Sequence, residues 1–562
     1  MKVVTVIHNA VRARLVEPEE EVRCLVQEYL SYEVQGAEHM GKGGWDGRTS
    51  LFQRQKNQFP AGFVGLVRSR LTQAGYKVSV KRKEPPAPRG EQHPQVDDFG
   101  FTERYAYQYL VPERLVDLKM MIAQIATGGG KSRVFKMCAK RLNMPTLFLT
   151  NRKSLMYQMA EGYQESFPDE AIGIVGDGKW NPNANGVTFA IVDTLVSRLE
   201  VYDFEKMARK EIENHLEMVE DKIVGVLKMK KLPFTKEFVK IAPESVQKAV
   251  SQIREAVANK LPFDQKAVEN KIKAKIERQV ARRKSAIAFL EKILFVTLEE
   301  AHDVSGSGFF NILNSCKNAD YRLALTATPF MKGSEEANMR LMAAAGSIGI
   351  KVSEESLIEK GILAKPYFKY IPVPRAVKLF RSTPWQKAYK AGIVDNGHRN
   401  AQVIEHCIQM KRRGLTTMVL VQQTKHGDVL KKMMKQAELK AEFIRGADEQ
   451  VKRQEALNKL GSGQIDVLIG TTILDVGVDV PAVGMVILAG GGKAEVALRQ
   501  RIGRGLREKK KGANVCFIVD FADGHNNHLQ DHYQERRAIV EGTPGFNEGV
   551  VDDFDYKAIL GA

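Results

Sequence analysis

The stretch IAQIATGGGKSRVF, residues 122–135, decides the fold class of this chain of 562 residues. An apolar, strand-like run ends in three consecutive glycines, and a helical pattern follows. Such glycines let backbone N–H groups turn around a phosphate chain at a helix N-terminus, whose dipole favours anions. Lys131 would then neutralise the β- and γ-phosphates, and the Ser132 hydroxyl would hold Mg²⁺. The complete P-loop pattern has glycine where this chain has Ile125, so a plain glycine-rich strand–helix turn is the alternative.

A second motif lies further along the chain, in ILFVTLEEAH, residues 293–302. An apolar strand ends in two carboxylates, which would emerge at the carboxyl edge of a sheet, where open α/β folds bind ligands. Glu299 could support Mg²⁺, and Glu300 could orient and deprotonate an attacking water. An acidic N-cap of the next helix is the alternative, and the upstream glycine motif disfavours it.

Apolar strand-like runs alternate with helical sequence around both motifs, which is typical of parallel sheets covered by helices. The runs fall into two groups, so we expect two parallel-sheet lobes joined near residues 365–400. The first group is PTLFLT, VTFAIVDTL, ILFVTLEE and YRLALTATP, and the second is TMVLVQQ, IDVLIGTT, GMVILAGG and NVCFIVDF.

Two segments precede the first lobe. Residues 1–80 predict a small α+β domain, with strand-like runs VVTVI, LFQRQ and YKVSV and one helical stretch, PAGFVGLVRSRLTQAGY. Residues 81–98 hold four prolines and many charges, which predicts an extended, semi-rigid linker.

Residues 200–292 interrupt the first lobe and carry almost no strand signal. We expect a helical insertion whose helices break at prolines and whose apolar residues form a seam. Residues 271–284 hold seven basic side chains against one acidic one, so a DNA-facing helix competes with a merely solvated face. The prolines are Pro233, Pro243 and Pro262; the seam residues are Ile212, Leu216, Val219, Ile223 and Val226, then Ile272, Ile276 and Val280.

Composition and charge narrow the class of protein. The chain is 43% hydrophobic and 27% charged, as globular proteins are, and no apolar run is long enough for a membrane helix. Lys and Arg total 85 against 67 acidic residues, and this net charge of +18 favours a polyanionic partner. The five cysteines form no C-x-x-C pair, and the first residues lack the apolar core of a secretory signal. We therefore expect a cytoplasmic protein without zinc or disulfides.

The order A-T-G-G-G-K-S, E-E-A-H, L-T-A-T-P (Leu325 to Pro329) and Q-R-I-G-R-G-L-R (Gln500 to Arg507) resembles that of superfamily 2 helicases. Weaker matches occur in the same order: LFLTNRKSLMYQ, the Asp193–Thr194 pair, and TTILDVGVD (Thr471 to Asp479). The resemblance implies two RecA-like lobes, 99–370 and 371–525, that bind ATP and Mg²⁺ between them. Beyond about residue 525 the sequence becomes polar and acidic, with no clear element after one short helix, so residues 526–562 are expected to be a C-terminal tail.

The resemblance also implies roles for individual residues. Catalytic roles fall on Lys131, Glu299, Glu300, Gln500 and the arginine fingers Arg504 and Arg507, with Ser132 and Glu299 at Mg²⁺. Nucleotide contacts fall on Tyr107, Gln108, Thr127, Gly128, Gly129, Gly130, Lys131, Ser132, Gly477 and Asp479. His302, Thr326 and Thr328 would couple the ATP state to the grip on nucleic acid. The resemblance implies DNA contacts at Arg152, Thr194, Arg445 and Thr471. Independently of the resemblance, the basic density of the insertion suggests DNA contacts at Lys275, Arg278 and Arg282. Trp45 and Arg48 are further candidates, and packing in the core of the small domain is the alternative for Trp45.

The first 80 residues carry a narrower resemblance. SYEVQGAEHMGKGGWDGRTSLF, followed by FPAGFVGLVRSRLTQAGYKVSV, is similar to the N-terminal domain of the phage UvsW-type helicases. This similarity implies action on forked, branched and partly single-stranded DNA by branch migration in recombination, repair and replication. It further implies a location in the host cytoplasm and replication or recombination proteins as partners. The helical insertion departs from that pattern.

Three alternatives remain open. The first is a translocating subunit of a restriction or repair system, and the second is an RNA helicase, whose lobes share these motifs. The third is a junction-binding protein with feeble turnover, because Glu299 stands where the family has aspartate.

Overall fold

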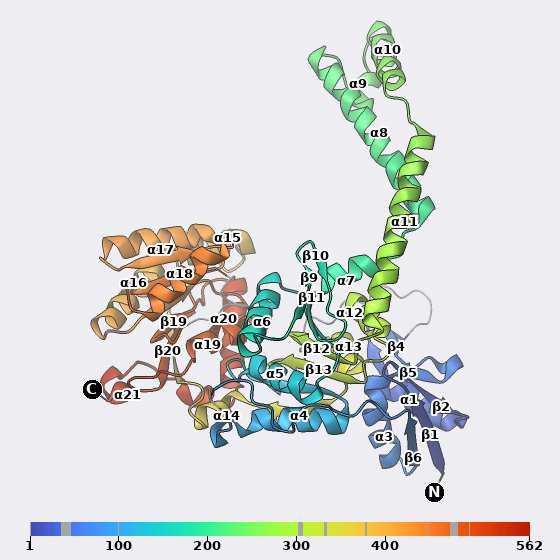
Figure 1. Cartoon of the computed structure of the whole chain (residues 1–562). Helices are drawn as coiled ribbons and strands as arrows, with labels where there is room; N and C mark the ends of the chain where they lie inside the picture. The colour runs from blue at the N-terminus through green and yellow to red at the C-terminus, as the bar shows by residue number, and fades with distance from the viewer. Residues whose placement is uncertain are drawn as a thin grey trace. The chain divides into compact units, whose positions relative to one another are not determined.

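The computed structural model describes residues 2–34, 46–98, 100–301, 307–330, 334–376, 379–446, 448–471, 481–493 and 495–561. The chain divides into two compact units (Figure 1). One comprises Met1–Asp193 and Glu291–Ala562, and the other is the insertion Thr194–Leu290.

The first lobe is built on an eight-stranded sheet of order β10-β9-β11-β8-β12-β13-β7-β14. β10 pairs antiparallel with β9, and the other described pairs of this sheet are parallel. The strands are β7 Met120–Ile125, β8 Thr146–Thr150, β9 Ile172–Gly176, β10 Lys179–Asn181, β11 Val187–Ile191, β12 Phe295–Glu299, β13 Tyr321–Thr326 and β14 Ile348–Val352. The helices are α4 Ala106–Leu118, α5 Lys131–Leu142, α6 Lys153–Ser166, α7 Val192–Leu199, α12 Ser307–Ser315, α13 Glu335–Ala345 and α14 Glu354–Glu359.

Burial on both faces explains why these strands read as continuous apolar runs. Every residue of β8, β12 and β13 is buried. Aromatic rings pack between α5 and the sheet, with the Phe135 ring centroid 4.8 Å from that of Phe148 and 5.9 Å from that of Phe189. Strands covered on both faces are typical of parallel α/β sheets. The predicted fold class is confirmed for this lobe.

The second lobe contains a six-stranded parallel sheet of order β15-β20-β19-β16-β18-β17. Its first strand, β15, crosses the expected boundary between residues 370 and 371, so this sheet begins at Lys365. The strands are β15 Lys365–Pro372, β16 Thr417–Leu420, β17 Ala441–Ile444, β18 Val467–Gly470, β19 Met485–Ile487 and β20 Val515–Ala522. The helices are α15 Trp385–Tyr389, α16 Gly397–Arg412, α17 Thr424–Gln436, α18 Gln450–Gly461 and α19 Glu495–Gly505, with a π-helical turn at Lys390–Val394.

The segment expected to be a C-terminal tail packs into the second lobe. Phe554 is buried, with its ring centroid 4.9 Å from that of Phe517 in β20. The backbone N–H of Val551 donates to Phe368 O in β15. Phe554 lies in an acidic stretch that shows no helical or strand periodicity, which is why the sequence suggested a polar tail. The helices here are α20 Asn527–Glu541 and α21 Tyr556–Leu560.

The N-terminal domain has a sheet of order β5-β2-β1-β6 and a two-stranded sheet, β3-β4. The strand expected in LFQRQ is wrong, since Arg54–Lys56 forms a 3₁₀ turn. A helix that we did not predict, α1, buries Val22 and Val26. The elements are β1 Val3–His8, β2 Arg12–Val16, α1 Glu20–Tyr29, β3 Ser31–Glu33, β4 Arg48–Ser50, β5 Gln58–Pro60, α3 Val64–Gln73 and β6 Lys77–Arg82.

This domain and the linker after it lie against the first lobe. The apolar core of the domain includes Ala343 of α13. A Cβ on Gly62 would come within 2.2 Å of Met342 O, so only glycine fits there. The linker donates the Arg89 N–H to Leu142 O and accepts a hydrogen bond from the Tyr321 hydroxyl at Pro86 O. It is therefore fixed along the lobe by several backbone contacts.

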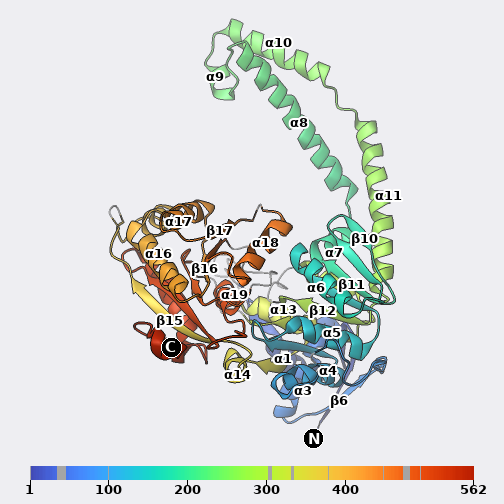
Figure 2. The same cartoon turned by 60° about the vertical axis from the view of Figure 1, so that its left-hand side comes forward.

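The insertion contains two long helices, α8 and α11, joined through α9 and α10 (Figure 2). Each predicted proline lies in a break between helices: Pro233 between α8 and α9, Pro243 directly before α10, and Pro262 between α10 and α11. The predicted seam is only partly confirmed: Ile223 and Leu227 pack against Val250, whereas Leu216 and Val280 are 62% and 60% exposed. The helices are α8 Phe204–Met229, α9 Lys236–Lys240, α10 Glu244–Lys260 and α11 Gln265–Leu290. Across the described parts of the chain, no helix has both the length and the apolar composition of a membrane span.

Candidate active site

The glycine-rich loop lies between β7 and α5, as the sequence predicts. Gly128 and Gly130 have φ of 88° and 80°, which is left-handed backbone that favours glycine. A Cβ on Gly130 would lie 2.3 Å from Gln108 Nε2, and one on Gly128 would lie 2.7 Å from Leu363 Cδ2. The loop is therefore held as a tight backbone turn at the start of α5, which is the form of a phosphate cradle.

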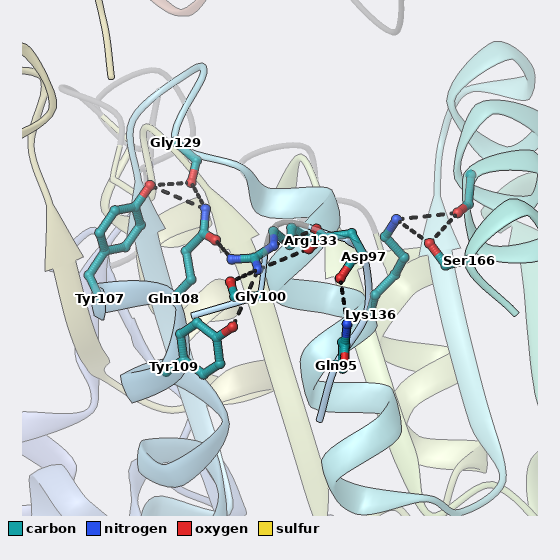
Figure 3. Close-up of polar contacts among 11 residues, drawn as sticks. Gln95, Asp97, Gly100, Tyr107, Gln108, Tyr109, Gly129, Arg133, Lys136 and Ser166 are labelled. Carbon is teal, nitrogen blue, oxygen red and sulfur yellow. Dashed lines mark hydrogen bonds and ion pairs between the residues drawn. The ribbon is translucent and has the colours of Figure 1, made fainter. Parts of the chain in front are cut away.

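Two side chains of α4 hold this loop from one side (Figure 3). The Tyr107 hydroxyl donates to Gly129 O at 2.6 Å, and Gln108 Nε2 donates to the same carbonyl at 3.1 Å. Burial raises the pKa of Tyr107 to about 12, so the phenol stays protonated as this hydrogen bond requires. Both residues thus lie beside the loop, as expected for a pair that contacts the nucleotide.

Arg133 fixes Gln108, a role that no sequence signal indicated. Its guanidinium donates to Gln108 Oε1 at 2.6 Å and pairs with both carboxylate oxygens of Asp97, at 2.6 and 3.1 Å (Figure 3). It also donates to Gly100 O at 2.7 Å. With Oε1 occupied, the Gln108 amide is oriented so that its Nε2 faces the loop.

Strand register brings the acidic motif to the same sheet edge as the loop. β13 lies between β7 and β12, with Glu299 paired to Leu325 and Thr326 paired to Gln124. Gln124 Nε2 donates to Ala327 O at 3.3 Å. The carboxyl ends of these parallel strands thus gather the loop, Glu299 and Thr326 at one edge, which is where such folds bind ligands.

Glu299 is a buried acid, and one of its carboxylate oxygens accepts no hydrogen bond from the described residues. It is 6% exposed, and its Oε2 has no hydrogen-bond partner among the described residues. Burial raises the pKa of Glu299 well above the usual range of a glutamate, Lys131 opposes this shift, and Glu300 adds to it. A buried carboxylate oxygen near Lys131 fits a divalent cation, because carboxylates and hydroxyls are the ligands that Mg²⁺ prefers. Glu299 and Ser132 are therefore suited to hold Mg²⁺.

The backbone turns sharply at Glu300, directly after β12. Its φ of 51° is uncommon for a residue with a side chain, and such backbone clusters at functional sites. The neighbouring strand, β13, ends at Thr326, whose Oγ1 accepts a hydrogen bond from the Thr328 N–H at 3.2 Å. Glu300 and the Thr326–Thr328 segment thus follow two adjacent parallel strands at the same sheet edge as the glycine loop.

The second lobe reaches this site through α19. A Cβ on Gly503 would lie 2.8 Å from Thr127 Cβ, so the helix backbone lies directly against the glycine loop. Gln500 on the same helix is 8% exposed. Arg507 forms an isolated β-bridge with Leu363, whose side chain contacts Gly128. Arg504 lies in α19, and its side chain is outside the described residues.

The remaining expected contacts lie elsewhere. Arg152 is the N-cap residue of α6, and Thr194 lies in α7. Arg445 forms an ion pair with Asp428. Thr471 follows β18 and is 8% exposed. Arg48 opens β4, and Lys275, Arg278 and Arg282 lie on α11. Trp45, His302, Gly477 and Asp479 fall outside the described residues.

Two protein families match this chain. Residues 103–331 match the type III restriction enzyme res subunit family, and residues 399–509 match the helicase conserved C-terminal domain. Together they cover more than half of the chain and contain the glycine loop, the Glu299–Glu300 pair and α19. The chain belongs to the superfamily 2 helicases. Members of this superfamily are ATP hydrolases with two RecA-like lobes. The two parallel sheets of this chain belong to these two lobes.

Individual proteins resemble the helicase over different lengths. Putative helicase 22 of Sulfolobus islandicus filamentous virus is 27% identical, over 41% of this chain and 43% of its own. UvrABC system protein B of Fervidobacterium nodosum is 30% identical, over 24% of this chain and 21% of its own. The helicase thus spans less than half the length of these curated relatives. The crystal structure of T4 UvsW aligns with 98% of this chain and 99% of its own at 15% identity and a TM-score of 0.39.

Proposed function

We propose that the chain is an ATP-dependent DNA helicase that unwinds and branch-migrates forked and junction DNA. The observation that carries this proposal is the N-terminal domain, which holds the Asp46–Gly47–Arg48 turn and packs on α13 of the first lobe. Lobes of this kind need no such domain to hydrolyse ATP. A second folded surface fixed beside the motor can contact a second arm of a branch.

Each residue of the site would have a separate role in ATP hydrolysis. ATP bound with Mg²⁺ supplies the phosphoanhydride bond whose hydrolysis drives movement. Lys131 and the N–H groups of the glycine loop would bind the phosphates, while Ser132 and Glu299 would hold the cation. Glu300 orients the attacking water and accepts its proton. Arg504 and Arg507 stabilise the charge that develops on the transferred group.

A groove marks the junction between the N-terminal domain and the first lobe. It has a volume of about 240 Å³ and is lined by side chains of both parts, among them Arg12, Gln53, Gln58, Phe59 and Asn314. Arg12 and Arg14 project outward from β2, since the residues between and beside them, Ala13 and Leu15, are buried. Arginine and amide side chains are types that contact the DNA backbone. This junction is the surface that we assign to the second DNA arm.

Point substitutions test this assignment better than deletion, because removing the domain would expose the apolar face of α13. We expect Arg12→Gln with Arg48→Gln to lower the preference for four-way junctions over linear duplex by about fivefold or more in ATP-driven unwinding. ATPase activity stimulated by single-stranded DNA should change by less than about twofold. Lys56→Gln with Lys77→Gln removes the same charge from the same domain and should preserve the preference. An unchanged preference in the first variant would place branch recognition elsewhere.

The match to the res subunit family favours a second candidate, translocation along unbranched duplex. Displacement of a third strand from a linear triplex measures that activity directly. Strong triplex displacement without any preference for forks or junctions would favour this candidate over branch migration. RNA duplexes in the same unwinding assay test the RNA helicase alternative.

The Arg133–Gln108 contact leads to a prediction about nucleotide choice. In the helicase family, this glutamine reads adenine, and here Arg133 sets its orientation. Arg133→Met should therefore raise the KM for ATP by about tenfold and bring the ATP-to-GTP ratio of kcat/KM towards one. Lys140→Gln, on the same helix and paired with Glu170, should leave the ratio unchanged. If ATP and GTP hydrolysis fell equally, Arg133 would support only the fold.

A further inference from the structure

The root of the insertion carries a line of basic side chains on one face of α11. We define the stripe as Lys271, Lys275, Arg278 and Arg282. At about 100° per residue, these four positions fall within about 60° of one another around the helix. They extend over about 16 Å of its length. The sequence shows only that basic residues are frequent here, whereas the helix places these four in a row on one face.

The charges of the stripe are largely available to an external anion. Among the ion pairs of the described residues, Lys271 pairs with Glu211 at 3.4 Å, and none involves Lys275, Arg278 or Arg282. All four residues are exposed. Arg278 Nε donates to the carbonyl of Ala274 within its own helix. Charges that neighbouring carboxylates do not neutralise remain free to attract phosphate.

A neighbouring helix adds a fifth cation to the stripe. Arg198 lies on α7, four residues after Thr194 and so on the same face of that helix. Burial lowers the pKa of Arg198, and the positive charge of Arg282 lowers it further.

A buried amide holds α7 and α11 in this arrangement. Gln279 is 5% exposed, and its Nε2 donates to the carbonyls of Ser197, Arg198 and Glu200 at 2.8, 3.2 and 3.0 Å. Arg283 Nε donates to Leu199 O at 3.2 Å. These bonds cap the carboxyl end of α7, where backbone carbonyls would otherwise lack partners. Arg198 is therefore presented to the stripe from a fixed position.

We infer that the stripe and Arg198 form a binding surface for the phosphate backbone of duplex DNA. This inference rests on the proposed function and extends it to the insertion. A straight, rigid row of cations suits the regular phosphates of a duplex. Single strands are usually bound by aromatic side chains that stack on bases. The ring of Tyr202 is covered by Lys275, whose Nζ lies 5.7 Å from the ring centroid. The surface thus recognises charge and shape rather than sequence.

Salt dependence of duplex binding tests this surface in the full chain. We expect Lys275→Gln, Arg278→Gln and Arg282→Gln together to weaken binding to a linear duplex about tenfold or more. The slope of log K against log salt should fall by up to about 0.9 for each phosphate that the variant no longer neutralises. Binding to single-stranded DNA and ATPase activity without DNA should both stay within about twofold of the wild type.

The same helix provides a matched control. Another face of α11, about 140–160° around the helix from Lys271, carries Lys266, Lys273 and Lys284. The triple variant Lys266→Gln, Lys273→Gln and Lys284→Gln therefore removes three charges from that face. This control should keep the wild-type slope. If both triple variants weakened duplex binding equally, binding would depend on overall charge and the proposed surface would be wrong. If the stripe variant weakened single-strand binding as much as duplex binding, the assignment to duplex DNA would be wrong. A wild-type chain that binds no DNA at all would instead contradict the proposed function.

Discussion

Replacing Glu300 with glutamine is expected to leave ATP bound while slowing its hydrolysis by at least about a hundredfold, a typical cost of losing a general base. The amide keeps the size and shape of the side chain but cannot accept the proton of the attacking water. The turn at φ 51° is set by the backbone, so the substitution should not alter it. Nucleotide affinity measured with a fluorescent ATP analogue, beside phosphate release with and without DNA, separates binding from turnover.

Two further variants make this result specific. Lys131→Ala should lose nucleotide affinity itself, because the lysine neutralises phosphate charge in the bound ground state. Glu291→Gln makes the same chemical change at an exposed residue, paired with Lys317, and should hydrolyse ATP normally. Hydrolysis at the wild-type rate by Glu300→Gln would mean that the Glu299–Glu300 pair has been assigned to the wrong role.

The glycine loop and the acidic pair could be predicted because their signals are local. Each lies at the end of an apolar strand, and strand direction alone places both at one sheet edge. The orphaned Oε2 of Glu299 could not be predicted, since burial of a single oxygen depends on the packing of side chains from several strands. The glutamate that stands in place of the family's aspartate is therefore a longer acid that is 6% exposed and lies near Lys131.

Contacts between distant segments could not be predicted. Asp97 belongs to the proline-rich linker, yet it holds Arg133, which lies 36 positions later in α5. Nothing in the sequence of the linker distinguishes Asp97 from the neighbouring Asp98. In contrast, α1 had a readable signal, with Val22, Val26 and Leu30 four residues apart and all buried. Short strand-like runs on either side of this segment obscure its helical spacing.

Removing either arginine finger is expected to have the largest effect on catalysis. Arg504→Ala and Arg507→Ala should each lower kcat for ATP on the order of a thousandfold, with little change in nucleotide affinity, because their charge matters most in the transition state. The contact between Gly503 and Thr127 supports this expectation, since it places the backbone of α19 directly against the glycine loop. The β-bridge from Arg507 to Leu363 ties the end of the same segment to a residue that touches Gly128.

Arg499→Gln provides the matched control for the two fingers. Arg499 lies on α19 as well, but it pairs with Glu354 at 3.3 Å, so its substitution should lower kcat by less than about threefold. Single-turnover hydrolysis with DNA present measures the chemical step in all three variants, and equilibrium binding of nucleotide measures the ground state. If Arg504→Ala and Arg507→Ala weakened binding as much as turnover, both arginines would act on the ground state. The second lobe would then close over ATP without contributing to the transition state.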